Sequence, residues 1–184
     1  MRHPIVQFYF DYAALKELRR TGWLNRGISR EDAESVADHS YSVALLAYVV
    51  STEYFPQLEQ GKVMSMALIH DIAEVIVGDI TPGDGVPLEE KHRREAEAVR
   101  RIFSGLPNAE RYVSLWEEYE AGTSPEARFV KEMDRLDTVF QAAWYEQKGH
   151  TKVEDFFPWA EARIKSPELR PILEDLLRYR TEKT

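Results

Sequence analysis

Two adjacent polar residues follow an apolar run near the middle of the chain. His70 and Asp71 come directly after residues 67–69 (Ala-Leu-Ile), inside a segment expected to be a buried helix. A carboxylate buried without a partner is costly, and a divalent cation would compensate it. Imidazole and carboxylate are ligands common to several metals. Glu74 lies four residues after His70, hence on the same helical face. An isolated His-Asp pair more often forms ordinary hydrogen bonds at a helix surface.

Two further polar residues in apolar surroundings favour a metal site over that alternative. His39 lies at the start of one apolar predicted helix, and Asp134 lies inside another. Each alone is readily explained as a core polar residue that has a hydrogen-bond partner. Together with His70 and Asp71 they occur in the order His, His-Asp, Asp on three separate predicted helices, which could converge on one ion.

The residues around these positions form a more specific pattern. They read ESVADH over residues 34–39, HDIAE over 70–74 followed by Gly78 and Asp79, and KEMD over 131–134. This pattern resembles the HD-domain phosphohydrolase superfamily, and within it the small 5′-deoxynucleotidases, which remove phosphate from deoxynucleoside 5′-monophosphates. The resemblance runs from about residue 22 to residue 146. It implies an all-α, single-domain helical bundle of the HD-domain type.

The same resemblance implies a metal site. His39, His70, Asp71 and Asp134 would hold a divalent ion, which could be cobalt, manganese, magnesium or zinc. Asp137, one turn further along the same helix, is the alternative to Asp134. Four N/O ligands leave positions open on a six-coordinate ion, and open positions are typical of a catalytic site. Such an ion can bind phosphate and water and orient them for in-line attack.

Two carboxylates are expected to move protons in this reaction. By the resemblance, Glu74 and Asp79 are important for catalysis. Glu74 would orient the attacking water or act as its base, and Asp79 would give a proton to the leaving 5′ oxygen. The alternatives are an exposed helix carboxylate for Glu74 and a turn residue for Asp79.

Substrate contacts are expected from the segment before the second long helix, where the resembling enzymes contact the nucleotide. Trp23 could stack on a base or sugar, and Arg26 could pair with phosphate. Bacterial members of the group carry an arginine immediately before the tryptophan, whereas Gly22 occupies that position here. Either phosphate capture comes from another residue, for which Arg26 is the candidate, or the substrate preference differs from that of those members. A core-anchoring role for Trp23 is an equal alternative.

Two other functions compete with the monophosphatase. The first is a pyrophosphohydrolase acting on a guanosine alarmone or a nucleoside triphosphate. The second is a non-catalytic sensor that binds metal and nucleotide. The short chain and the HDxxExxxGD register favour the monophosphatase. Glu74 and Asp79 argue against the sensor, because a pure binder has no need of acid/base carboxylates.

Apolar residues at spacings of three and four predict helices along nearly the whole chain. Gly22 is expected to break the first helix, with residues 23–34 forming an ordered loop. The loop 79–87 is rich in glycine and proline. The predicted helices cover residues 5–18, 35–56, 59–77, 87–103, 109–119 and 125–147, and two short closing helices fall within about 156–180. One domain spans residues 1–184, with the motif-bearing core at about 22–146.

Bulk composition restricts the possible partners. With 32 acidic and 24 basic residues the chain has a formal net charge of −8, which disfavours a nucleic-acid-binding module. The sequence contains no cysteine, so thiolate metal sites and disulfides are excluded. The longest apolar run, residues 43–50, is far too short to cross a membrane. We expect a cytoplasmic protein with a small nucleotide substrate and no membrane partner, and the resemblance implies a homodimer.

Overall fold

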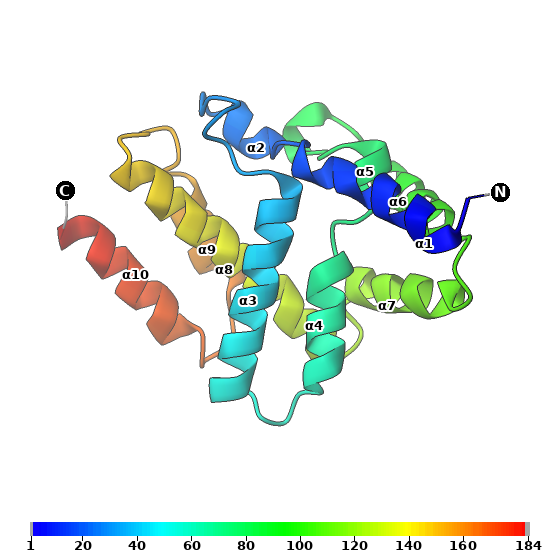
Figure 1. Cartoon of the computed structure of the whole chain (residues 1–184). Coiled ribbons are helices and arrows are strands. Elements are labelled where there is room, and N and C mark those ends of the chain that lie inside the picture. The colour runs from blue at the N-terminus through cyan, green and yellow to red at the C-terminus, as the bar shows by residue number, and fades with distance from the viewer. Residues whose placement is uncertain (1, 183–184) are drawn as a thin grey trace.

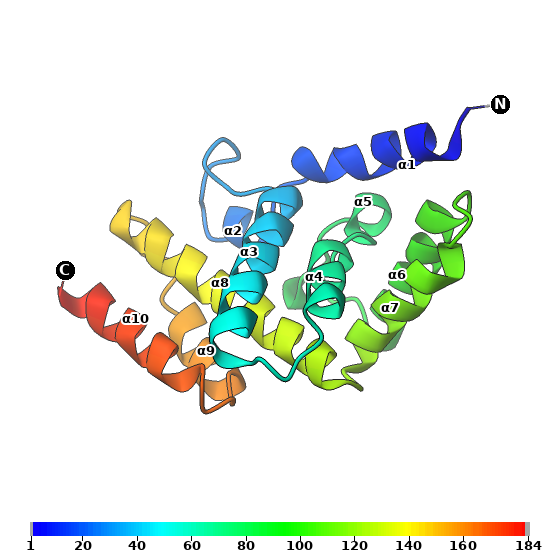
Figure 2. The ribbon, with the colours of Figure 1, turned by 60° about the horizontal axis from the view of Figure 1, so that its bottom comes forward.

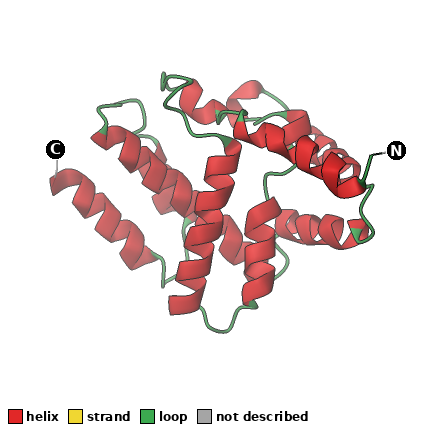
Figure 3. Cartoon of the chain, viewed as in Figure 1, coloured by secondary structure: helices red, strands yellow, loops and turns green. Residues whose placement is uncertain are grey.

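The computed structural model describes residues 2–182 and is built from helices joined by short loops (Figure 3). Within that range there is no strand, and extended backbone pairs at an isolated antiparallel bridge between Arg19 and Ser35. The all-α prediction is confirmed. The elements are α1 (Pro4–Ala13), η1 (Ala14–Lys16), α2 (Thr21–Leu24), α3 (Val36–Tyr54), α4 (Gln60–Ile69), α5 (Glu74–Val77), η2 (Pro82–Asp84), α6 (Leu88–Phe103), α7 (Ala109–Ala121), α8 (Pro125–Gln147), α9 (Phe156–Arg163) and α10 (Arg170–Glu182).

The two longest helices begin at capping serines. Ser35 caps α3: its hydroxyl accepts from the Asp38 backbone N–H at 3.1 Å, and the Asp38 carboxylate accepts from the Ser35 N–H at 2.9 Å. Ser124 caps α8 by accepting from the Ala127 N–H at 3.1 Å, and Pro125 occupies the first turn. These caps satisfy backbone donors that a helix leaves unpaired, and they fix the residue at which each helix begins.

The helices enclose two hydrophobic clusters. The larger one joins α3, α4 and α8 to α9 and α10, and the smaller one joins α1, α5, α6 and α7. In both ribbon views α1 and α10 lie at opposite ends of the molecule, with α3, α4 and α8 between them (Figures 1 and 2). Ala67 on α4 belongs to the larger cluster, and Ile72, just beyond α4, to the smaller. His70 and Asp71 therefore lie where the two clusters meet.

The predicted continuous helix over residues 59–77 is wrong. α4 ends at Ile69, and α5 begins at Glu74. Between them the backbone N–H groups of Ile72 and Glu74 bond three residues back, at 3.1 and 3.0 Å, instead of four. Competing donors explain the break. The His70 ring takes the Ala67 carbonyl, and the Trp116 indole donates to the His70 carbonyl at 3.0 Å. The expected stop at Gly78, which has a φ of +79°, is confirmed.

The chain around Gly22 also differs from the prediction. Instead of a break, residues Thr21–Leu24 form the short helix α2. The segments on either side are tied together, because Arg20 N–H donates to the Glu34 carbonyl and Val36 N–H to that of Leu18. This pairing holds α2 against the start of α3. No helix over the described residues is long and apolar enough to cross a membrane.

Candidate metal centre and active site

His70 is fixed by the break that ends α4. Its Nδ1 lies 2.8 Å from the Ala67 carbonyl oxygen, and because a carbonyl only accepts, Nδ1 carries the proton. Nε2 is then unprotonated and free to bind a metal. A hydrogen bond from the second ring nitrogen is the usual way in which proteins orient a metal-ligating histidine.

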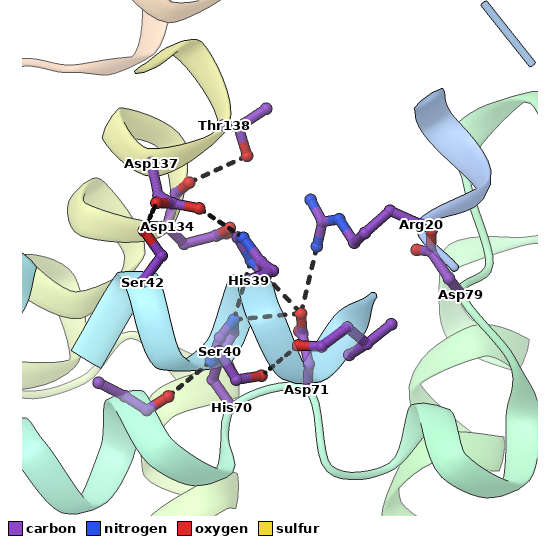
Figure 4. A network of polar contacts seen from close by, with 12 residues as sticks. Arg20, His39, Ser40, Ser42, His70, Asp71, Asp79, Asp134, Asp137 and Thr138 are labelled. Atoms are coloured by element: carbon purple, nitrogen blue, oxygen red, sulfur yellow. Dashed lines mark hydrogen bonds and ion pairs between the residues drawn. The ribbon is translucent and has the colours of Figure 1, made fainter. Parts of the chain in front are cut away.

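His39 is fixed in the same way from α3. Its Nδ1 lies 2.7 Å from an Asp137 carboxylate oxygen on α8, and Ser42 donates to the other oxygen of that carboxylate. His39 is fully buried, and Asp137 is only 3% exposed. The carboxylate therefore holds the Nδ1 proton, and Nε2 points away from it toward His70 (Figure 4).

The Nε2 atoms of both rings lie close to Asp71, and the three residues are spaced closely enough to hold an ion, while Asp134 approaches the group from the His39 side. The His39 and His70 Nε2 atoms are 3.4 Å apart. Asp71 Oδ2 lies 3.1 Å from His70 Nε2 and 3.6 Å from His39 Nε2. Asp134 Oδ1 lies 3.2 Å from His39 Nε2. Ligand atoms roughly 2.1 Å from one ion are about 3.0 to 3.4 Å apart in octahedral or tetrahedral geometry. The donor set and its spacing thus fit a divalent ion.

The charges of the cluster depend on one another. Burial and Arg20 each lower the pKa of His39, but hydrogen bonds to Asp134 and Asp137 outweigh them and raise that pKa to about 10. Burial would raise the pKa of Asp71, yet His70, His39 and Arg20 together hold it well below its ordinary value. Two partly buried carboxylates thus lie close together, and a bound cation would balance their charge.

Asp134 and Asp137 occupy different sides of His39. Asp134 faces Nε2, where His70 and Asp71 also point, whereas Asp137 faces Nδ1. Glu34, His39 and Asp137 also group closely enough to hold an ion. However, Glu34 already accepts the Trp23 indole N–H at 2.7 Å, and Asp137 already pairs with the ring. The geometry therefore favours Asp134 over Asp137 as the fourth ligand.

Glu74 and Asp79 lie beside this cluster. Glu74 is 5% exposed, and its Oε2 has no hydrogen-bond partner among the residues described by the structure. Burial, Asp71 and Asp79 raise the pKa of Glu74 well above its ordinary value. The alternative of an exposed helix carboxylate is therefore wrong for Glu74. Asp79 follows Gly78 and accepts the backbone N–H of Thr21, so the turn at the end of α5 is tied to α2.

Arg20 is the functional candidate that the sequence analysis missed. Its guanidinium lies 3.3 Å from Asp71 Oδ2 (Figure 4), and its side chain is 17% exposed. The nearby carboxylates of Glu74, Asp79 and Asp134 also act on its charge. Arg20 precedes Trp23 by three residues, whereas the family pattern predicts an arginine immediately before the tryptophan. The α2 turn brings the guanidinium to the metal centre despite that offset in sequence.

The centre opens into two cavities that share Asp71, Glu74, Lys91 and Asp134. One, the α7 cavity, has a volume of about 780 Å³ and is also lined by residues of α6 and α7, including His92, Trp116 and Glu120. The other, the α9 cavity, has a volume of about 680 Å³ and is also lined by Arg20, Asp79, residues 80–83 and the α9 residues Phe156 and Trp159. Both volumes lie in the range typical of small-molecule sites.

The predicted substrate residues Trp23 and Arg26 also line the α9 cavity, but both are engaged elsewhere. Trp23 is 1% exposed and packs on Tyr145 and Phe156 with ring centroids 5.1 and 4.6 Å apart. The core-anchoring alternative is therefore the one that its surroundings favour. Arg26 forms an ion pair with Asp155 and lies 4.1 Å above the Phe156 ring. Its charge is thus matched by Asp155 at the rim, whereas Arg20 pairs with Asp71 at the centre itself.

Comparison with known proteins is consistent with this geometry. Residues 12–172 match the HD domain family. The chain is 40% identical over 176 residues to the human protein named 5′-deoxynucleotidase HDDC2, an alignment covering 94% of this chain and 84% of that one. It is 38% identical to the Schizosaccharomyces pombe protein named 5′-deoxynucleotidase hdd1, covering 97% and 91%.

Solved structures of related proteins have a similar fold. The PH0347 protein of Pyrococcus horikoshii superposes with a TM-score of 0.79 at 31% identity, covering 97% of this chain and 99% of that one. A predicted metal-dependent phosphohydrolase of Magnetospirillum magnetotacticum superposes with a TM-score of 0.73 at 29% identity, covering 98% and 92%. The match across residues 12–172 and the relatives along nearly the whole chain establish that this protein belongs to the HD domain family.

Proposed function

We propose that the protein is a metal-dependent 5′-deoxynucleotidase, which hydrolyses deoxynucleoside 5′-monophosphates to a nucleoside and inorganic phosphate. One observation carries the proposal: two imidazole nitrogens and two carboxylate oxygens from three separate segments meet within 3.1 to 3.6 Å of their neighbours. Relatives named 5′-deoxynucleotidase, at about 40% identity over most of the chain, support the same activity.

The ion would be held by His39 and His70 through Nε2 and by Asp71 and Asp134 through carboxylate oxygens. We infer cobalt, manganese, magnesium or zinc, because imidazole and carboxylate together suit all of these divalent ions. When bound, such an ion supplies Lewis acidity that withdraws charge from a phosphate oxygen and makes a nearby water more acidic. Asp137 and the Ala67 carbonyl keep the two rings oriented for it.

The remaining side chains perform the other tasks of hydrolysis. Arg20 binds the phosphate, since a guanidinium matches phosphate oxygens with paired donors. Lys91, which lines both cavities, adds a second positive charge beside the metal centre. Glu74, whose buried Oε2 has no hydrogen-bond partner among the described residues, orients the water and takes its proton. Asp79 faces the α9 cavity and protonates the 5′ oxygen as the P–O bond breaks.

The test is phosphate release from nucleoside mono-, di- and triphosphates by metal-stripped protein resupplied with each ion in turn. Metal-dependent release from deoxynucleoside 5′-monophosphates alone is expected. Pyrophosphate or triphosphate release from other nucleotides would assign the protein to the pyrophosphohydrolases instead. Nucleotide binding without turnover, at full metal occupancy, would support the sensor.

We also infer a homodimer in the cytoplasm. The exposed face of α3 carries an apolar stripe at helical spacing, formed by Tyr41, Leu45, Tyr48 and Val49. An apolar stripe that remains exposed favours contact with another protein surface. Light scattering on the purified protein tests the dimer, and cell fractionation tests the location.

A further inference from the structure

The two cavities at the metal centre differ in the chemistry of their walls. In the α7 cavity polar side chains contact one another: His92 lies 3.6 Å from Glu120, Lys131 lies 3.8 Å from Glu120, and Arg100 pairs with Glu117. A nucleobase that entered this cavity would have to displace water from these contacts, although Trp116, Tyr119 and Leu88 also line it.

In the α9 cavity one wall is aromatic, formed by Phe156 and Trp159 of α9, and Ile80 and Pro82 line the cavity from the loop. A nucleobase is a flat ring system with a polar edge, and aromatic side chains bind such rings through their faces. The α9 wall thus offers the nucleoside part of a nucleotide an aromatic surface on which its base can stack.

Trp159 is the member of this wall that has surface to offer. Trp23 is 1% exposed, and the Phe156 ring carries the Arg26 guanidinium 4.1 Å above it. Trp159 is half-buried at the cavity. Phe156 meets it edge-on with ring centroids 6.3 Å apart, and Arg163 lies 5.3 Å from its ring centre. The indole is thus partly covered, but its cation lies farther from the ring centre than Arg26 lies from that of Phe156.

The helix that carries Trp159 is firmly placed. Phe157, Ala160 and Ile164, on and just after α9, are buried in the larger hydrophobic cluster with α8. On the cavity side the Arg26–Asp155 ion pair joins α2 to the start of α9. A site built on anchored elements holds a ligand at lower entropic cost than one on a free loop.

We propose that the base of the nucleotide lies against Trp159 in the α9 cavity, so that α9 supplies the nucleoside subsite. The inference rests on the proposed function, because it is the reacting phosphate at the metal centre that directs the nucleoside toward α9. In this orientation the leaving 5′ oxygen faces Asp79, which borders the α9 cavity and not the α7 cavity. The attacking water then lies on the α7 side, as in-line displacement requires.

The test compares two substrates that share the phosphate but differ in the base. Deoxyadenosine 5′-monophosphate and 2-deoxyribose 5-phosphate are given to the metal-loaded protein and to its Trp159→Leu variant. Loss of one stacking contact is expected to lower kcat/KM for the nucleotide about tenfold and to leave the sugar phosphate within about twofold. Trp159→Phe, which keeps an aromatic face, should recover most of the loss.

Trp144→Leu is the matched control, because Trp144 is an exposed tryptophan on α8 that lines a different cavity. This variant should leave kcat/KM unchanged for both substrates. An equal loss for both substrates in Trp159→Leu, or no loss for the nucleotide, would overturn the subsite.

The nucleotide's binding affinity separates this inference from the proposed function. If the wild-type protein hydrolyses no monophosphate, the proposed function fails, and calorimetric binding of deoxyadenosine 5′-monophosphate still tests the subsite. Affinity about tenfold weaker in Trp159→Leu than in Trp144→Leu would support it. Equal affinities would refute it.

Discussion

His39 Nδ1 lies 2.7 Å from Asp137 Oδ2, in a contact between α3 and α8 that is closed to solvent. Asp137, the alternative to Asp134 as a metal ligand, thus contacts Nδ1 of the His39 ring, whereas Asp134 faces Nε2. A carboxylate placed there fixes the tautomer and increases the basicity of the nitrogen that faces the ion.

Asp137→Ala is expected to weaken metal binding about 10- to 100-fold, because the His39 ring loses the group that orients it. Asp137→Asn should lose less, since its amide oxygen still accepts from Nδ1. Titration of metal-stripped protein with cobalt or manganese measures the effect. Asp175→Ala, at an exposed ion pair on α10, is the control. Unchanged metal affinity in Asp137→Ala, with the protein folded, would exclude the positioning role.

Arg20→Ala should lower kcat/KM for a deoxynucleoside monophosphate about 100-fold and weaken inhibition by inorganic phosphate, because the charge-assisted pair with the phosphate is lost. Arg20→Lys should recover only part of the kcat/KM and of the phosphate inhibition, since an ammonium lacks the planar pair of donors. Arg26→Ala should leave phosphate inhibition unchanged, because Asp155 already neutralises Arg26. The reverse ranking of the two arginines would return phosphate binding to Arg26.

Glu74→Gln is expected to lower kcat at least about 100-fold, because an amide cannot accept the proton of water. Metal content should not change, since Glu74 is not among the four ligands. Elemental analysis and phosphate release on the same samples separate the two effects. Glu89→Gln, on an exposed carboxylate of α6, is the control for removal of a surface charge. Normal turnover by Glu74→Gln would remove the residue from the mechanism.

His70→Ala and Asp71→Ala should each abolish metal retention together with activity. Each change removes one of four ligands, and the cluster also loses a group that balances its neighbours' charge. Metal content after gel filtration is the measurement. If either variant kept a full equivalent of metal and wild-type activity, the ligand assignment would be wrong.

Local patterns in the sequence predicted most of the fold. Ser35 and Ser124 are capping residues that begin helices whatever packs against them, and Gly78 ends α5 with a backbone angle that glycine tolerates. The break after Ile69 could not be predicted in this way. It depends on the Trp116 indole, 46 residues away in the chain, donating to the His70 carbonyl. Periodicity contains no information about such a donor.

The residues of the candidate site also fall into those that local sequence patterns indicate and those that they do not. The four proposed ligands could be picked out because their order and flanking residues are local signals. Arg20 was missed because it lies at the start of α2, and the packing of that short helix places its guanidinium at the metal centre. Trp159 was missed because α9 lies outside the segment that carries the motifs. Side chains delivered by tertiary packing from unmarked segments leave no pattern in a single sequence.

Glu95 on α6 provides a test of stability against pH. Burial raises its pKa from the ordinary 4.5 to about 7, and Lys91, at 3.6 Å, offsets only part of that rise. Between these two values the folded state keeps a proton that the unfolded state has released. The contribution of Glu95 to the free energy of unfolding therefore falls as pH rises from 4.5 to 7, and the loss is complete above 7.

Glu95→Gln removes this dependence, because the amide stays neutral. The variant should match the wild type near pH 4.5 and exceed its free energy of unfolding by on the order of 1 kcal/mol at pH 8, after allowance for solvent screening. Urea unfolding at several pH values measures the difference. Glu97→Gln, an exposed carboxylate on the same helix, should show no such trend. A Glu95→Gln variant less stable than the wild type at pH 8 would mean that the Lys91 ion pair outweighs the cost of burial.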